Sequence, residues 1–189
     1  MGKKILIVVD MQNDFVTGAL RNEEGMRIVP LVQKKVEQAL ANGDRVLFTK
    51  DTHYENYMHT EEGTNLPVPH CIKASWGWEI VDELKEFADK ETNIFLKETF
   101  GSSELGKQIA QVVSTDSSIE GIELVGLCTD ICVISNAVIA KAFAPNIPIY
   151  VDAACCAGVT PQSHDTAVAA MEAFQIHVEH KGEEPWRVD

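Results

Sequence analysis

Cys128 and Cys132 stand four residues apart, where the apolar run 122–127 gives way to a helical pattern. We expect Thr129 or Asp130 to cap that helix, which places Cys132 in its first turn. Free backbone N–H groups at a helix start stabilise a thiolate and can hold an oxyanion during acyl transfer. Cysteine is also among the residue types most often buried, so a nucleophile and a buried thiol are equally good interpretations of Cys132 from this segment alone. Cys128 precedes the cap and is less well placed for catalysis.

A thiol nucleophile needs a base, and two charged residues follow other apolar runs. Asp10 comes directly after residues 4–9, and Lys97 directly after residues 93–96. A carboxylate whose surroundings raise its pKa can accept the proton of a thiol, and the charge of a lysine can steady both groups. Each residue alone is more simply explained as a turn aspartate or a surface lysine. Their common placement at the ends of expected strands favours a catalytic group with Cys132.

The segment 51–76 has no periodicity and is rich in His, Pro, Glu and Gly. It contains Asp51 and His53, which are two residues apart, and His70. One carboxylate and two imidazoles suit Zn²⁺, Fe²⁺ or Mn²⁺, and a structureless segment of this length in a compact domain is usually functional. A polar loop whose histidines make ordinary hydrogen bonds is the alternative. Three further side chains of the segment could add a ligand, namely His59, Glu61 and Glu62.

Apolar runs alternate with helical patterns along the whole chain. The runs are typical of strands, five of them continuous and the last an alternating edge strand: residues 4–9, 45–49, 93–96, 122–127, 147–151 and 175–179. We therefore predict an α/β fold, a doubly wound six-stranded parallel sheet with helices on both faces in a Rossmann-like three-layer sandwich. We expect residues 1–189 to form a single domain. Ligands of such sheets bind at the carboxyl ends of the strands, where the candidate residues would converge.

The helical patterns have recognisable ends. Pro30 opens the first helix, whose apolar positions include Leu40, and Gly43 closes it. An apolar stripe predicts a second helix over 78–88. The remaining patterns are a helix capped by Ser102 or Ser103, a helix with Ile131, Ile134, Val138 and Ala142 on one face, and a helix capped by Thr160 before Pro161. The residues from Lys181 onward are polar and are expected to be loosely held.

Asp152, Cys155 and Cys156 follow the fifth expected strand and should border the pocket or an interface. We interpret Cys155 and Cys156 as packing thiols, because no base or helix start is visibly paired with them. Adjacent cysteines also rarely satisfy the geometry of a disulfide.

The composition favours a soluble protein that binds a small molecule. A hydrophobic content of 45% and a charged content of 24% are typical of a globular domain. The net charge of −13 argues against a nucleic-acid partner, and no apolar run is long enough to span a membrane. The run 4–9 ends at Asp10 and lacks the features of a signal peptide, so we expect a cytoplasmic protein with free thiols.

Three segments resemble the signature segments of the isochorismatase-like cysteine hydrolases. They are VVDMQNDF with Asp10, FLKETF with Lys97, and GLCTDICV with Cys132. The loop DTH…PVPHC resembles the metal loop of the nicotinamidase branch, and the similarity covers about residues 4–179. The resemblance implies that Cys132 is the nucleophile, that Asp10 takes its proton and passes it to leaving ammonia, and that Lys97 completes the triad.

The resemblance implies further roles. The backbone N–H groups of Cys128 and Cys132 would form an oxyanion hole, with a cis peptide bond between Leu127 and Cys128. Phe15 would pack on the ring of the substrate. The metal ligands would be Asp51, His53 and His70, and the metal would be zinc, with iron or manganese as alternatives.

The implied reaction is hydrolysis of nicotinamide to nicotinate and ammonia through a cysteine thioester, in a protein that forms homo-oligomers. The sequence departs from the family pattern at one place, because Pro67, beside Leu66, stands where nicotinamidases often carry an aromatic residue. Another small amide, isochorismate, or a non-catalytic binding module are therefore the alternatives. The intact metal loop favours the first reading over isochorismate, and the complete triad favours it over a binding module.

Overall fold

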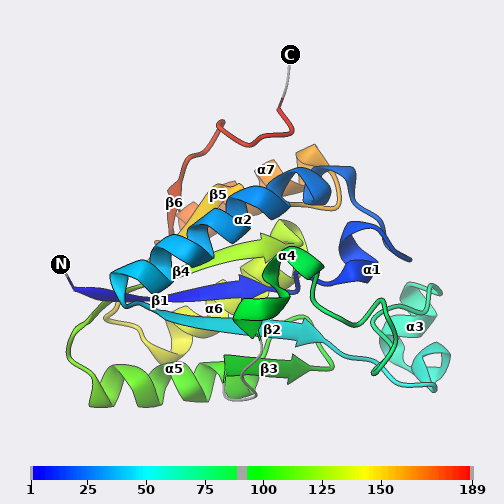
Figure 1. Ribbon diagram of the computed structural model, residues 1–189, viewed down its shortest axis with the longest axis horizontal. Helices are drawn as coiled ribbons and strands as arrows, with labels where there is room; N and C mark the ends of the chain where they lie inside the picture. Colours follow the sequence, from blue (N-terminus) through cyan, green and yellow to red (C-terminus); the bar gives the residue numbers. More distant parts are fainter. Residues whose placement is uncertain (1, 89–92, 188–189) are drawn as a thin grey trace.

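The computed structural model describes residues 2–88 and 93–187. Six strands form one sheet in the order β3-β2-β1-β4-β5-β6, and every pair of neighbours is parallel (Figure 1). The strands are β1 (Lys3–Val9), β2 (Arg45–Asp51), β3 (Ile94–Lys97), β4 (Ile119–Leu127), β5 (Ile149–Ala157) and β6 (His177–Glu179). The predicted doubly wound parallel sheet is confirmed.

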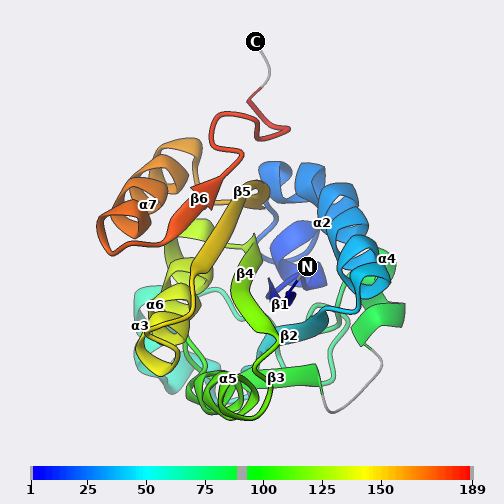
Figure 2. The same cartoon turned by 90° about the vertical axis from the view of Figure 1, so that its left-hand side faces the viewer.

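Helices cover both faces of the sheet (Figure 2). One face carries α2 (Glu23–Asn42) and α4 (Asp82–Lys85), and the other carries α5 (Ser103–Thr115), α6 (Ile134–Phe143) and α7 (Pro161–Ala173). Two apolar clusters lie between the sheet and these layers, which explains why the central strands are apolar on both sides. The short elements are α1 (Asn13–Val16), η1 (Tyr57–His59), α3 (Glu61–Asn65), η2 (Glu86–Ala88) and η4 (Thr129–Val133). Among the described residues, no helix is both long and apolar enough to cross a membrane.

Helix α2 begins earlier than expected. Its N-cap is Asn22, whose side chain accepts a hydrogen bond from the N–H of Gly25, so Pro30 lies inside the helix and does not open it. Pro30 is exposed, where water can satisfy the carbonyl group that the missing N–H leaves free. Gly43 closes the helix with a left-handed conformation as predicted, but Leu40 is exposed and not part of the buried stripe.

Two other helices differ from the prediction. The expected helix over 78–88 is reduced to α4 and the single turn η2, and Trp78 lies in the turns before them. In α6 the expected face is wrong, because Val138 is exposed and Ala137 and Ala140 are buried instead. The preceding π-helical turn η4 holds one residue more than an α-helical turn, which shifts the buried face by about one position.

The C-terminal part of the fold is more ordered than its composition suggested. Strand β5 continues through Asp152 and Cys155, so these residues belong to the sheet and do not follow it. The segment after Lys181 packs on the body of the protein: Trp186 is 9% exposed, and its indole N–H donates to the carbonyl oxygen of Cys156 at 3.3 Å. Glu184 is buried as well and pairs with a buried imidazole of α7. The predicted loose tail is therefore wrong for residues 181–187.

Candidate active site and metal centre

The ends of three neighbouring strands bring Asp10, Asp51 and Lys97 into one cluster. Strand β2 pairs with β3 so that Asp51 lies beside Lys97, and Val9 at the end of β1 pairs with Thr49. The Lys97 Nζ atom lies 2.6 Å from Asp10 Oδ2 and 3.1 Å from Asp51 Oδ1. The hydroxyl of Thr49 donates to Asp10 Oδ1 at 2.6 Å. The register of the sheet thus buries one lysine between two carboxylates.

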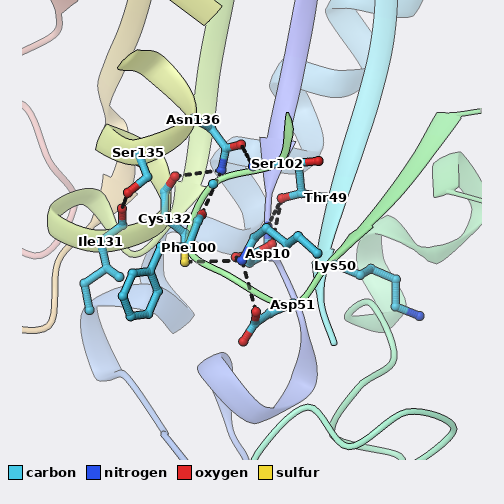
Figure 3. Close-up of polar contacts among 12 residues, drawn as sticks. Asp10, Thr49, Lys50, Asp51, Phe100, Ser102, Ile131, Cys132, Ser135 and Asn136 are labelled. Carbon is cyan, nitrogen blue, oxygen red and sulfur yellow. Dashed lines mark hydrogen bonds and ion pairs between the residues drawn. The ribbon is translucent and has the colours of Figure 1, made fainter. Parts of the chain in front are cut away.

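Cys132 completes this cluster from the opposite side. It lies in η4, and its side chain points from the start of the helical segment toward the strand ends (Figure 3). The Lys97 Nζ atom lies 3.5 Å from the Cys132 sulfur, within hydrogen-bond distance for a thiol. The structure therefore brings together Asp10, Lys97 and Cys132. Along the chain, Asp10 is 87 residues from Lys97, and Cys132 is 35 residues from it.

Burial and neighbouring charges together shift the pKa values of Asp10, Lys97 and Cys132. Burial raises the pKa of the Cys132 thiol well above its ordinary value, and the nearby Asp10 carboxylate adds to the rise. Burial also raises the pKa of Asp10, although Lys97 acts in the opposite direction. Burial would lower the pKa of Lys97, but the surrounding negative groups, Asp10 foremost, raise it. These directions favour a neutral thiol beside a charged lysine over the thiolate that the helix start was expected to stabilise.

The turn that carries the thiol differs in detail from the sequence prediction. It is a single π-helical turn, Thr129–Val133, and its N-cap is Cys128 and not Thr129 or Asp130. The side chain of Asp130 is engaged elsewhere, because it accepts a hydrogen bond from the N–H of Val159 at 3.0 Å. The Cys128 side chain is partly exposed and lines the cavity in front of the thiol.

The approach of strand β4 to this turn depends on a glycine. Gly126 has a φ of 117°, and a Cβ atom at this position would lie 2.2 Å from the carbonyl oxygen of Val9. Only glycine lets β4 come this close to β1 with that conformation. The peptide bond between Leu127 and Cys128 is cis, as the family resemblance implied.

Four side chains next to the cluster point at a common centre: Asp51, His53, Glu62 and His70, with one ligating atom of each within 4.8 Å of the others. His53 Nε2 lies 3.0 Å from Asp51 Oδ2 and 3.5 Å from Glu62 Oε1. His70 Nε2 lies 3.4 Å and 3.6 Å from the same two oxygens. Ligands of a tetrahedral zinc ion, each about 2.1 Å from the metal, are about 3.4 Å apart. The donor set and its spacing therefore fit a divalent transition metal.

Residues 51–76, which supply these ligands, were expected to be structureless, and this expectation is wrong. The segment contains η1 and α3, and His53 forms a bridge to Ile72. Because α3 begins at Glu61, successive side chains point in different directions: Glu62 turns toward the cluster, and Glu61 is exposed. His59 is exposed too and does not join the four ligands.

A cavity of about 720 Å³ opens onto both groups of residues. Asp51, His70 and Cys132 lie on its wall, so a ligand inside it would reach the thiol and the four-residue cluster together. Phe15 lines the same cavity, with its ring centroid 5.6 Å from that of His70 in an edge-on arrangement. Leu66 also lines the wall, and it directly precedes Pro67, at which the sequence departs from the nicotinamidase pattern.

A family model described as the isochorismatase domain matches residues 4–181. The chain belongs to the isochorismatase family. The uncharacterized isochorismatase family protein PncA of Bacillus subtilis is 30% identical over 173 residues, which cover 88% of this chain and 93% of that protein.

Solved structures of similar proteins share the fold. The crystal structure of nicotinamidase PncA from Bacillus subtilis matches with a TM-score of 0.77 at 27% identity, over 93% of this chain and 98% of that one. The pyrazinamidase of Pyrococcus horikoshii in complex with zinc matches with a TM-score of 0.75 at 26% identity, again over 93% and 98% of the two chains. This isochorismatase-family chain is therefore a hydrolase of the nicotinamidase-like type, which confirms the predicted family and enzyme class.

Several residues that shape the site of this isochorismatase-family chain escaped the sequence analysis. The Gln12 side chain holds both backbone groups of Asp51, accepting from its N–H at 2.7 Å and donating to its carbonyl oxygen at 2.9 Å. Asn136, fully buried, donates to the carbonyl oxygen of Cys132 at 2.8 Å and accepts from the N–H of Ser102 at 3.0 Å (Figure 3). The sequence carried no signal for Asn136, because the apolar face predicted for its helix did not include position 136.

Proposed function

We propose that this isochorismatase-family hydrolase converts nicotinamide to nicotinate and ammonia through a thioester on Cys132. The observation that carries the proposal is the position of Lys97 Nζ, 2.6 Å from Asp10 and 3.5 Å from the Cys132 sulfur, at a cavity large enough for a small amide. A thiol, a buried proton acceptor and a fixed positive charge are what a cysteine needs to attack an amide. The similarity to a nicotinamidase and a pyrazinamidase supports an amide substrate of this kind.

The first half of the proposed reaction forms the thioester. The Cys132 sulfur attacks the carboxamide carbon while its proton passes to Asp10, so the thiolate never persists in the buried site. As the tetrahedral intermediate collapses, the carbon–nitrogen bond breaks and Asp10 gives the proton to the nitrogen, which leaves as ammonia. Protonation is required because an amine is otherwise a poor leaving group. The raised pKa of Asp10, caused first by burial, suits a group that must both accept and return a proton.

The second half releases the acid. A water molecule attacks the thioester carbon and gives one proton to Asp10, the carbon–sulfur bond breaks, and the sulfur recovers that proton. Lys97 keeps its charge throughout and stabilises the carboxylate and the developing negative charge on sulfur. The N–H groups of Cys128 and Cys132, at the start of the helical segment, are the proposed donors to the oxyanion in both halves.

We further propose that Asp51, His53 and His70, with Glu62 as the fourth ligand, hold a divalent transition metal, zinc in the first place and iron or manganese as alternatives. Two imidazole nitrogens and two carboxylate oxygens at the observed separations support this assignment. The bound ion would supply a Lewis acid at the inner wall of the cavity. Phe15, beside His70, would pack on the ring of the substrate.

The catalytic proposal is tested by the substitution Cys132→Ala. Ammonia release from nicotinamide should fall to the uncatalysed level, because no sulfur remains to form the thioester. The matched control is Cys155→Ala, which also removes a buried thiol but lies in the core of β5 and should keep its activity. Unchanged ammonia release by a folded Cys132→Ala protein would refute the proposal.

The metal proposal is tested by elemental analysis of protein purified without added metal ions. We expect about one transition-metal ion per chain, and we expect His70→Ala to lose it. His59→Ala is the matched control, because this histidine belongs to the same loop but is exposed and points elsewhere. A fully active protein that contains no transition metal would show that the cluster is not a metal site.

A different small amide is the second candidate substrate. Two neighbouring residues favour such a substrate. Pro67 stands where nicotinamidases often carry an aromatic residue, and Leu66 beside it places an aliphatic side chain on the cavity wall. A panel of small amides with ammonia as the readout distinguishes the candidates. If an amide without a pyridine ring has a higher kcat/KM than nicotinamide, that amide is the preferred substrate, and the roles proposed for the catalytic residues stay the same.

A further inference from the structure

Three apolar side chains stand exposed at the mouth of the cavity that contains the thiol. Leu66, Phe100 and Val159 are 37%, 47% and 56% exposed, and all three line this cavity. They come from three separate parts of the chain: the end of α3, the loop after β3 and the loop before α7. Scattered exposed apolar residues are common on protein surfaces, but a group that converges on one opening is typical of a binding site.

The backbone at each of these residues is fixed by a specific hydrogen bond. The Tyr57 hydroxyl donates to the carbonyl oxygen of Leu66 at 2.8 Å, and the Asn136 amide donates to that of Phe100 at 3.2 Å. The N–H of Val159 donates to Asp130 at 3.0 Å, as described above. These bonds hold the three side chains around the opening. Phe100 lines the same cavity as Ile131 and Cys132.

The cavity is larger than a single-ring amide. Its volume is about 720 Å³, and its wall includes His70 and Cys132 as well as Leu66, Phe100 and Val159. Pockets of about 300–1,000 Å³ bury ligands of drug size, whereas a single-ring carboxamide held at the thiol would leave the mouth in contact with water.

We propose that the preferred substrate is an aromatic amide whose ring carries an apolar extension, and that this extension lies on Leu66, Phe100 and Val159. The proposal rests on the amide hydrolysis proposed above and specifies its substrate class. The extension is the occupant because the apolar mouth is continuous with the wall that holds the reacting thiol. Burial of an added aromatic group on these side chains would strengthen binding of the transition state as well as of the substrate.

The experiment compares nicotinamide with its derivatives that carry a phenyl group at ring position 4, 5 or 6. The measured quantity is kcat/KM from ammonia release by the metal-containing enzyme. We expect at least one derivative to exceed nicotinamide by roughly 10-fold or more, which corresponds to the burial of part of a phenyl ring. Three derivatives are needed because each directs the extension along a different line from the thiol.

Two variants test whether the mouth is responsible. Val159→Asn and Leu66→Asn each replace an apolar side chain of the mouth by a polar one, and each should remove most of the advantage of the phenyl derivative over nicotinamide. Val159→Asn, whose side chain takes no part in the proposed function, should also keep kcat/KM for nicotinamide within about threefold. The matched control is Val138→Asn, because Val138 is also exposed but lies on α6 outside the cavity. This control should leave the preference unchanged.

The outcomes separate this inference from the proposed function. If nicotinamide is hydrolysed at least as well as every derivative, or if the mouth variants slow all amides equally, the extended substrate is overturned. If the mouth variants convert an oligomer to single chains, as seen by light scattering, and slow all amides equally, the mouth is a subunit contact and the inference is again overturned. If Cys132→Ala does not reduce ammonia release from any of the amides, the proposed function itself has failed.

Discussion

Lys97 shows at the scale of one residue how neighbours change the role of a side chain. An ordinary lysine is solvated, but Lys97 is buried and lies within 3.5 Å of Asp10, Asp51 and Cys132. The residue type and its place after an apolar run were readable from the sequence. The proximity of the sulfur was not, because it depends on the register of β1, β2 and β3 and on the turn after β4.

Glu62 shows the complementary limit of a sequence. Glu61 and Glu62 are chemically equal and adjacent, so the choice between them as metal ligand stayed open. The start of α3 distinguishes them, because successive side chains of a helix point about 100° apart and only Glu62 lies near His53 and His70, which makes it the proposed ligand.

Asp10 gives the first prediction at this scale. In Asp10→Asn the amide can still accept the hydrogen bond of Thr49, but it cannot take a proton from the thiol. We expect kcat for amide hydrolysis to fall by about 10²- to 10⁴-fold, with the circular dichroism spectrum unchanged. Asp82→Asn, at an exposed position of α4, is the control and should keep full activity. A kcat within threefold of the unaltered protein would remove Asp10 from the mechanism.

Lys35 and Asp152 give a pH-dependent prediction. Lys35 pairs with both Glu123 and Asp152 on the α2 face of the sheet. Burial acts to raise the pKa of Asp152, but hydrogen bonds from Lys35 and His180 outweigh it and lower the pKa below its ordinary value of 3.8. A carboxyl group with a lowered pKa stabilises the folded state at every pH above its unfolded value, and this contribution is lost as the pH falls through the folded value.

The substitution Asp152→Asn should therefore lower the free energy of unfolding by about 1–3 kcal/mol at pH 7. As the pH falls below 3.8 toward the lower pKa of the folded state, the difference from the unaltered protein should shrink, because the unfolded chain then binds a proton that the folded carboxylate resists. Urea denaturation at both pH values measures the change. Glu37→Gln, an exposed residue of α2, is the control and should change little at either pH. An equal loss at pH 7 and in acid would mean that packing of Asp152 and not its charge is responsible.

At the scale of elements, the strands were predictable and the helix details were not. Continuous apolar runs predicted five of the strands, because a strand buried on both faces has few other compositions available, and an alternating pattern predicted the edge strand β6. The buried face of α6 was wrong because the π-helical turn η4 adds one residue that an ideal helical period does not contain. The start of α2 was wrong because Pro30 is a common first residue of helices, and the Asn22 cap eight residues earlier was overlooked.

The segment 181–187 was misjudged for a different reason. Its polar composition hides two anchoring side chains, Trp186 and Glu184, whose partners Cys156 and His164 are distant in the sequence. Composition describes a whole segment, whereas one buried indole is enough to fasten it.

This segment yields a stability prediction. Trp186→Ala should lower the free energy of unfolding by about 3–5 kcal/mol, because it removes a buried ring that contacts His164 at a centroid distance of 5.0 Å. Trp76→Ala is the matched control: Trp76 is 63% exposed, and its loss should change stability by less than about 0.5 kcal/mol. Urea denaturation followed by circular dichroism provides the comparison. A loss for Trp186→Ala as small as the one expected for Trp76→Ala would mean that the indole does not hold the C-terminal segment on the fold.

At the scale of the whole molecule, the family resemblance carries one expectation beyond the single chain. It predicts that copies associate into a homo-oligomer, and this stays a prediction. Multi-angle light scattering of the purified protein should give a multiple of the single-chain mass of 20.9 kDa. A mass of one chain at micromolar concentration would show that the site described above is complete in a monomer.

The strand order has a practical consequence. The chain up to β3 supplies Asp10, the lysine and the proposed metal ligands, whereas the part from β4 onward supplies the sulfur, and the two parts meet along the pairing of β1 with β4. A break in the turn at 116–118 would therefore divide the reactive groups between two fragments, neither of which could release ammonia alone. Fused to two interacting proteins, such fragments would form a complementation reporter whose enzymatic signal appears only on reassembly.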